Sequence, residues 1–134
     1  MYNKIVEIVS DASAFLAVAL NENARDWVIN KTSGLDILSP EVLPYEIGNA
    51  LIALKKKGRL DQAEIMRAFD ISQSIAVRLV PIRISEAINT AVRYNVYAYD
   101  AYYLQCCLEN SLPLISLDGR MCEVAASLGI EVME

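Results

Sequence analysis

The chain alternates between short apolar runs and longer stretches in which apolar residues recur every three or four positions. The first run, residues 4–10, is almost continuously apolar and predicts a strand buried on both faces of a sheet. A helix over residues 12–20 is expected next, because Ser10 or Asp11 can cap its first turn. Further strands are predicted over residues 36–38, 77–82, 113–117 and 130–133. Pro81 lacks a backbone donor, so its strand is expected at a sheet edge or near its own end.

The longer stretches have the spacing of amphipathic helices. They predict helices over residues 22–31, 39–57, 61–75, 85–94, 99–110 and 119–128. Ser39 is the expected cap of the helix over residues 39–57, with Pro40 in its first position. Pro44 offers a second starting point four residues later, where the regular helix would begin or bend. Ser85 is the expected cap of the helix that ends at Tyr94.

Strands that alternate with helices predict an α/β fold of three layers, α/β/α, with a mainly parallel central sheet. At 134 residues the chain is long enough for a sizeable core, and we expect a single domain over residues 1–134. No internal repeat, low-complexity segment or linker interrupts the pattern.

Composition narrows the possible classes of protein. A hydrophobic fraction of 54% with 22% charged residues excludes a disordered chain. No apolar run approaches the roughly 20 residues that span a bilayer, and Met1 to Lys4 lead directly into a strand without a visible signal peptide. We expect a cytoplasmic protein in which Cys106, Cys107 and Cys122 are buried, reduced thiols; a redox role is the alternative.

Charge and residue types restrict the chemistry. The net charge of −5 disfavours a protein that coats nucleic acid, but not an enzyme that meets phosphate with its own divalent metal. The chain has no histidine, so no imidazole can serve as general base or metal ligand. The cysteines lack zinc-ligand spacing, which leaves a hard ion bound by oxygen, Mg²⁺ or Mn²⁺.

Four acidic residues occupy positions that a parallel sheet would bring together. Asp11 and Asp118 follow predicted strands, and Glu46 and Asp100 lie near the starts of apolar helices. Because ligands of open α/β sheets bind beyond the carboxyl ends of the strands, we expect these side chains at one edge. Gathered carboxylates repel one another, and a cation relieves the repulsion. The sequence therefore predicts an acid-lined metal pocket.

Three further residues are candidates to support this pocket. Ser13 and Ser116 flank the two aspartates at the strand ends and can hold a carboxylate or a metal-bound water. Asn49 lies one helical turn beyond Glu46 and shares its face of the helix.

Each acid taken alone also has an ordinary structural explanation. Asp11 and Asp100 are good helix N-caps, and Glu46 is a normal solvated helix residue. Asp118 with Gly119 is a common turn sequence. Only the four acids together predict a metal site.

At these residues the chain resembles the PIN-domain ribonucleases, most closely the VapC-type toxins of toxin–antitoxin pairs. The resemblance covers nearly the whole chain and rests on four segments in order: Asp11 to Ser13, Pro44 to Leu51, Tyr99 to Tyr103, and Ile115 to Asp118. It implies a metal-dependent endoribonuclease that hydrolyses RNA phosphodiester bonds with one or two Mg²⁺ or Mn²⁺ ions. It also implies a cognate antitoxin, often with a helix in an apolar groove, and a homodimer.

The resemblance assigns roles to particular residues. The family's acids fall on Asp11, Glu46, Asp100 and Asp118, which would bind metal and carry out catalysis, and its Ser/Thr position falls on Ser116. Some relatives carry asparagine in place of the last acid and a further acid a few residues later. Met121 and Cys122 occupy that stretch here, so Asp118 is the only candidate.

Other features have two readings. The basic run over residues 55–59 and Arg120 can contact RNA phosphates, but such a run is also typical of a solvated helix end. The tyrosines near Asp100 can stack on bases, pack in the core or line an interface. The apolar stripe of Ile47, Leu51 and Leu54 is better explained as core than as a groove for a partner.

Rival functions require residues that the chain lacks. A phosphohydrolase of the haloacid-dehalogenase type needs a second aspartate where Ser13 stands, and a proofreading exonuclease needs Asp-x-Glu on its first strand. A phospho-receiver domain needs an acidic pair near the first strand and a lysine after a late strand. A non-catalytic PIN-like module that binds proteins is a further alternative, and failure of Mn²⁺ to stabilise the chain would favour it.

Overall fold

The computed structural model describes residues 4–134 and has a central sheet of four parallel strands. The strands are β1 (Glu7–Ser10), β2 (Asp36–Pro40), β3 (Arg78–Val80) and β4 (Leu114–Ile115), in the order β3-β2-β1-β4. Residues 1–3, on which the expectation of no signal peptide partly rested, lie outside the described part.

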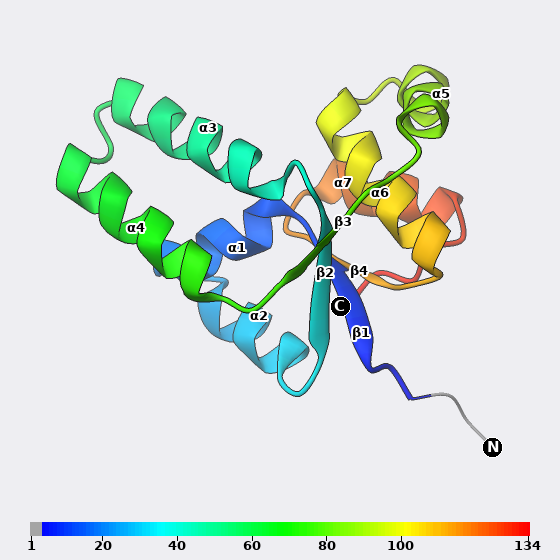
Figure 1. The fold of residues 1–134 in the computed structure, drawn as a ribbon, viewed down its shortest axis with the longest axis horizontal. Helices are drawn as coiled ribbons and strands as arrows, with labels where there is room; N and C mark the ends of the chain where they lie inside the picture. Colours follow the sequence, from blue (N-terminus) through cyan, green and yellow to red (C-terminus); the bar gives the residue numbers. More distant parts are fainter. Residues whose placement is uncertain (1–3) are drawn as a thin grey trace.

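Helices cover both faces of this sheet. They are α1 (Ala12–Ala19), α2 (Arg25–Thr32), α3 (Leu43–Lys56), α4 (Gln62–Ser74), α5 (Ile84–Tyr94), α6 (Ala98–Asn110) and α7 (Gly119–Ser127). Figure 1 shows α1 to α4 on one side of the sheet, which is seen edge-on, and α5 to α7 on the other. The three-layer α/β/α fold with a parallel sheet is therefore confirmed. Within residues 4–134, no helix is both long and apolar enough to cross a membrane.

The central strand β1 is buried on both faces, as its unbroken apolar sequence predicts. Ile8 packs with Ala14, Ala17 and Val28 of α1 and α2, whereas Val9 belongs to the larger core cluster. Neighbouring residues of a strand point to opposite faces, so the two side chains enter different layers. The apolar stripe of α3 contributes Ile47 and Leu51 to the core, which confirms the core interpretation.

The prediction that Ser39 caps a helix is wrong. Ser39 and Pro40 are the last residues of β2 and pair with β3, and the Ser39 hydroxyl donates to the Ser10 carbonyl at 2.5 Å. The helix α3 begins at Leu43 with Pro44 in its second position, at the later of the two predicted starts. Proline is tolerated there because the first-turn N–H groups have no partner within the helix.

Two further local predictions are wrong. The helix α5 begins one residue before Ser85, and the carboxylate of Glu109 on α6 accepts a bond from the Arg83 backbone N–H at 2.7 Å instead of a serine cap. The predicted strand over residues 130–133 forms only an isolated bridge between Val132 and Leu114. Pro81 behaves as expected, because β3 is an edge strand and ends directly before it.

The sheet places two loops side by side where the functional site is expected. Central β1 pairs in parallel with β4, with Ser10 opposite Ile115. Both strands end there, so Asp11 and Ser116 leave the sheet at the same edge.

Candidate functional site

Asp11 is the most enclosed of the predicted acids, with 3% of its surface exposed. It caps α1 by accepting a bond from the Ala14 N–H at 3.1 Å. The Ser13 hydroxyl lies 2.7 Å from Oδ1 and 2.9 Å from Oδ2, and the Ser116 hydroxyl donates to Oδ2 at 2.5 Å. Asp11 is therefore a helix cap, as expected, and its carboxylate also accepts hydrogen bonds from two serine hydroxyls.

The two serines connect α1 to the loop after β4. The Ser13 hydroxyl accepts a bond from the Leu117 N–H at 2.9 Å, and the Ser116 hydroxyl accepts one from the Asp118 N–H at 3.0 Å. Both predicted supporting serines thus hold Asp11 and fix the backbone that leads to Asp118.

Asp118 is the N-cap of α7. Its Oδ1 accepts a bond from the Met121 N–H at 3.0 Å, and the side chain is half-buried. Asp118 therefore fulfils the cap and turn role and also stands beside Asp11.

Glu46 lies in the first turn of α3 and is held from the opposite layer. Tyr103 of α6 is fully buried and donates its hydroxyl to Glu46 Oε1 at 2.9 Å. Tyr103 is a site residue that the sequence pattern did not predict. Its position was one available signal, because Tyr103 lies one helical turn after Asp100. A tyrosine hydroxyl that is buried near acids usually finds a polar partner.

Asp100 lies in the first turn of α6 but is not its cap; Tyr97 occupies the cap position. The carboxylate is half-buried, and burial raises its pKa to about 6. The negative charges of Asp118 and Asp11 are smaller causes of the same rise in pKa.

Burial and mutual repulsion act on the other acids as well. Burial raises the pKa of Asp11 against the hydrogen bonds from its serines, and Asp118 adds a smaller upward effect. Burial also raises the pKa of Glu46, partly offset by Tyr103, with Asp11 and Asp100 adding repulsion. The structure thus brings the four predicted acids within range of one another's charge.

The donor chemistry of this cluster fits a hard divalent cation. It offers carboxylate and hydroxyl oxygens without histidine, which are ligands that suit Mg²⁺ and Mn²⁺. Among residues 4–134, no three acidic or cysteine side chains already stand in an arrangement that could hold a metal ion. The acids are near enough to perturb one another but do not form a closed ligand shell.

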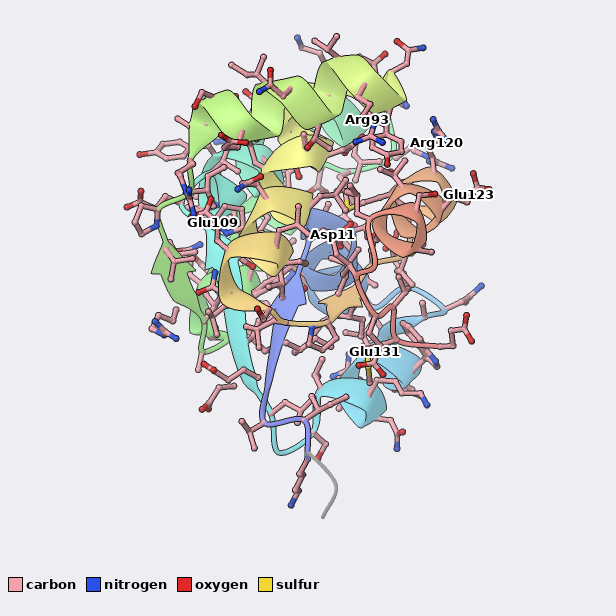
Figure 2. The ribbon with its side chains drawn as sticks, turned by 90° about the vertical axis from the view of Figure 1, so that its right-hand side faces the viewer. Asp11, Arg93, Glu109, Arg120, Glu123 and Glu131 are labelled. Carbon is pink, nitrogen blue, oxygen red and sulfur yellow. The ribbon has the colours of Figure 1, made fainter. Side chains whose placement is uncertain are left out.

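Arg120 has protein partners of its own. Its Nη2 donates to the Tyr94 carbonyl at 2.7 Å, and its Nη1 lies 3.6 Å from a Glu123 carboxylate oxygen. The Arg93 guanidinium lies over the Tyr94 ring, 5.3 Å from its centroid. Figure 2 shows Arg93 and Arg120 above Asp11, near the end of α5. Arg120 therefore joins α7 to α5.

The remaining candidate residues make no contact with the four acids that is described above. Asn49 is exposed on α3, as are Lys55 and Lys56 at the C-terminal end of the same helix. Cys106 and Cys107 are buried free thiols, whereas Cys122 is only partly buried, contrary to the prediction. Burial raises the pKa of Cys106 to about 12. These thiols are therefore protonated at neutral pH, which favours the packing interpretation over a redox role.

Comparisons with known proteins identify the family of this chain. The PIN domain family matches residues 8–127 of the chain. Ribonuclease VapC9 of Mycobacterium tuberculosis is 31% identical over 119 residues, which cover 85% of this chain and 87% of that protein.

Solved structures share the fold. PAE2754 from Pyrobaculum aerophilum has a TM-score of 0.69 and 30% identity, and the match covers 95% of this chain and 83% of that one. VapC20 of M. tuberculosis, described as a sarcin-ricin loop cleaving toxin, has a TM-score of 0.66 at 14% identity, with 87% and 93% covered. The family match over most of the chain and the 31% identity establish that this protein belongs to the PIN-domain family, among its VapC-type members.

Proposed function

We propose that this chain is a divalent-metal-dependent endoribonuclease and the toxin of a toxin–antitoxin pair. The observation that carries the proposal is the gathering of Asp11, Glu46, Asp100 and Asp118 at one edge of the sheet, where three of them have raised pKa values. The relatives at 31% identity bear the name ribonuclease. Acids that repel one another in this way are suited to a cation that neutralises them.

Asp11, Asp100 and Asp118 would bind one Mg²⁺ or Mn²⁺ directly, and Glu46 would bind a second ion or position a water. A bound ion of this kind polarises the scissile phosphate and lowers the pKa of a coordinated water. The lack of histidine leaves a carboxylate to accept the proton of the attacking water.

The neighbouring side chains keep these acids in place before substrate arrives. Ser13 and Ser116 fix both oxygens of Asp11, and Tyr103 fixes one oxygen of Glu46 and leaves the other available. Fixed orientation of this kind lowers the cost of reorganisation during the reaction.

The proposal includes partners. An apolar hollow of about 270 Å³ between α1, α2 and the end of α4, lined by Phe15, Val28 and Ile75 among others, suits a helix of a cognate antitoxin. Exposed Ile88 and Val92 lie four residues apart on α5 and suit a homodimer contact. An RNA-cutting toxin of this kind would act in the cytoplasm, where its substrate lies.

Cleavage of a panel of structured RNAs by the purified protein tests the proposal. We expect cleavage with Mg²⁺ or Mn²⁺, none with EDTA, and none by a D11N/D100N double variant in either condition. The D70N variant is a matched control, because Asp70 is an exposed aspartate on α4. Equal cleavage by the double variant and the wild type would contradict the assignment.

The open arrangement of the acids is the one observation that favours a non-catalytic PIN-like module. Thermal melting with added Mn²⁺ separates the two functions. Stabilisation of the wild type but not of the double variant supports the enzyme, and absence of both stabilisation and cleavage supports the module.

A further inference from the structure

A second hollow lies on the same edge of the sheet, at the carboxyl ends of β2 and β3. Its volume is about 330 Å³, and Pro40 and Val80, the last residues of the two strands, contribute to its wall. Since β2 is the neighbour of β1, the hollow and Asp11 lie along one continuous edge.

The helices that carry the tyrosines of this hollow also carry Glu46 and its hydrogen-bond partner. Tyr45, which lines it, directly precedes Glu46 on α3. Tyr102, which also lines it, directly precedes Tyr103, whose hydroxyl donates to Glu46. Each tyrosine of the hollow is therefore the chain neighbour of one partner in the Tyr103–Glu46 hydrogen bond.

Two aromatic rings and one carboxylate give this hollow its chemistry. Tyr45 is 79% exposed, and the Tyr102 ring is supported by an edge contact with Tyr99, with the ring centroids 5.9 Å apart. Glu41 is the acidic residue of the lining, and the other lining residues, all within residues 4–134, are aliphatic or proline.

This lining suits a flat, neutral ring that carries hydrogen-bond donors. An arginine or lysine would be expected where a phosphate binds, and the lining of this hollow, which lies wholly in the described part of the chain, contains neither. Aromatic side chains that reach solvent beside a phosphodiester-cleaving site are the usual partners of unpaired bases. A carboxylate accepts hydrogen bonds from base edges and donates none when ionised.

We infer that this hollow binds the nucleobase adjacent to the scissile phosphate and that Glu41 selects guanine there. Guanine presents two adjacent donors, N1–H and the N2 amino group, which match the two oxygens of the carboxylate. Adenine and cytosine offer one amino donor on the same edge, and uracil offers one ring N–H between two acceptors that the carboxylate repels. The inference rests on the proposed RNA cleavage and adds base selection to it.

Mapping of cleavage ends in a random-sequence RNA pool tests the selection. The wild type should enrich guanine at one fixed position next to the cut. E41Q should lose most of this enrichment, because an amide presents a donor to one of the two guanine donors. E22Q is the matched control, since Glu22 is exposed at the far end of α1 from Asp11 and should leave the enrichment unchanged.

Stacking is tested by substitution of Tyr45. Y45A should slow cleavage at the guanine-containing sites by about tenfold, and Y45F, which keeps the ring, should behave as the wild type. Unchanged enrichment in E41Q, or no base preference in the wild type, would overturn the inference while the proposed function stands.

A binding measurement in EDTA decides the case even if no RNA is cut. Titration with 5′-GMP should shift the ring resonances of Tyr45 and Tyr102 at lower concentration than 5′-CMP or 5′-UMP, and E41Q should remove the difference. Absence of these shifts would overturn the inference. A second result would also overturn it. If Y45A sediments as a monomer where the wild type is a dimer, and base selection is unchanged, the hollow is a contact between two copies.

Discussion

Asp11 combines a structural and a proposed chemical role in one buried carboxylate. It caps α1 and, with Ser13 and Ser116, joins that helix to the loop after β4. Asparagine is as good a cap as aspartate, whereas alanine provides none. The two roles can therefore be separated by two substitutions at the same position.

We predict that D11N abolishes RNA cleavage but leaves the free energy of unfolding in EDTA equal to or above that of the wild type, since a desolvated charge is removed. D11A should abolish cleavage and also lose about 1–2 kcal/mol of stability with the cap. Urea unfolding in EDTA measures the difference. Equal destabilisation by both variants would show that the charge itself supports the fold.

Tyr103 is predicted to hold Glu46 in position. Y103F removes the hydroxyl that donates to Glu46 Oε1 but keeps the buried ring. We expect a stability loss of about 1 kcal/mol, weaker Mn²⁺ binding by calorimetry, and a lower kcat for RNA cleavage.

Tyr97 on the same helix provides the control, because it is exposed at the N-terminus of α6. Y97F should change neither Mn²⁺ binding nor stability. A Y103F variant with unaltered Mn²⁺ affinity and unaltered kcat would remove Tyr103 from the site.

For single residues, the sequence predicted that the four acids lie together, but it did not predict that Tyr103 holds Glu46. Asp11 and Asp118 follow strands and stand out next to apolar runs. Tyr103 lies within an apolar helix, and its partner Glu46 lies 57 residues earlier in the chain. A contact of this kind depends on how α3 and α6 pack across the sheet, which local pattern does not specify.

At the scale of elements, α4 has the most complete start signal in the chain. Asp61 accepts a bond from the Glu64 N–H at 2.8 Å, and the Glu64 carboxylate accepts one from the Asp61 N–H at 3.1 Å. This reciprocal pair stabilises the first turn of a helix that packs beside α3, as Figure 1 shows.

We therefore predict that D61A lowers the free energy of unfolding by about 0.5–2 kcal/mol without changing RNA cleavage, because α4 contributes none of the four acids. Denaturant unfolding and the RNA assay measure the two effects. D61N should retain most of the stability. A loss of cleavage in D61A at a temperature where it remains folded would connect α4 to the site.

The elements also show where local signals fail. Ser39 has a good cap sequence, yet pairing of β2 with β3 extends the strand through Pro40. Ser85 also resembles a cap, but the Glu109 carboxylate on α6 accepts the hydrogen bond from the Arg83 backbone N–H where α5 begins. In both places a contact from another element decides the boundary, so the sequence predicted the elements better than their ends.

For the whole molecule, the raised pKa values of the acids predict a pH-dependent stability. Between the ordinary pKa of an aspartate, 3.8, and the pKa of about 6 in the fold, Asp100 binds more protons folded than unfolded. Stability in EDTA should therefore fall as the pH rises through this window, and Asp11 and Glu46 shift in the same direction. The hydrogen bond from the Arg83 N–H is the main cause of the lowered pKa of Glu109. The stability that Glu109 contributes is therefore lost as the pH falls below its ordinary pKa of 4.5.

We predict that the melting temperature in EDTA decreases from about pH 4 to about pH 6 and that D100N flattens this slope. Added Mn²⁺ should raise the melting temperature most at the upper end of the range, where the acids are ionised. Differential scanning calorimetry provides the measurement. A slope of opposite sign, or one that D100N leaves unchanged, would show that other groups control the stability in this range.

The central claim is that carboxylates from distant segments meet at one edge of the sheet and bind a divalent cation. Anomalous diffraction from crystals soaked in Mn²⁺ tests it most directly. We expect an anomalous peak within coordination distance of Asp11, Asp100 and Asp118, and its absence from crystals of the D11N/D100N variant. Crystals that hold Mn²⁺ elsewhere but none among these three side chains would contradict it.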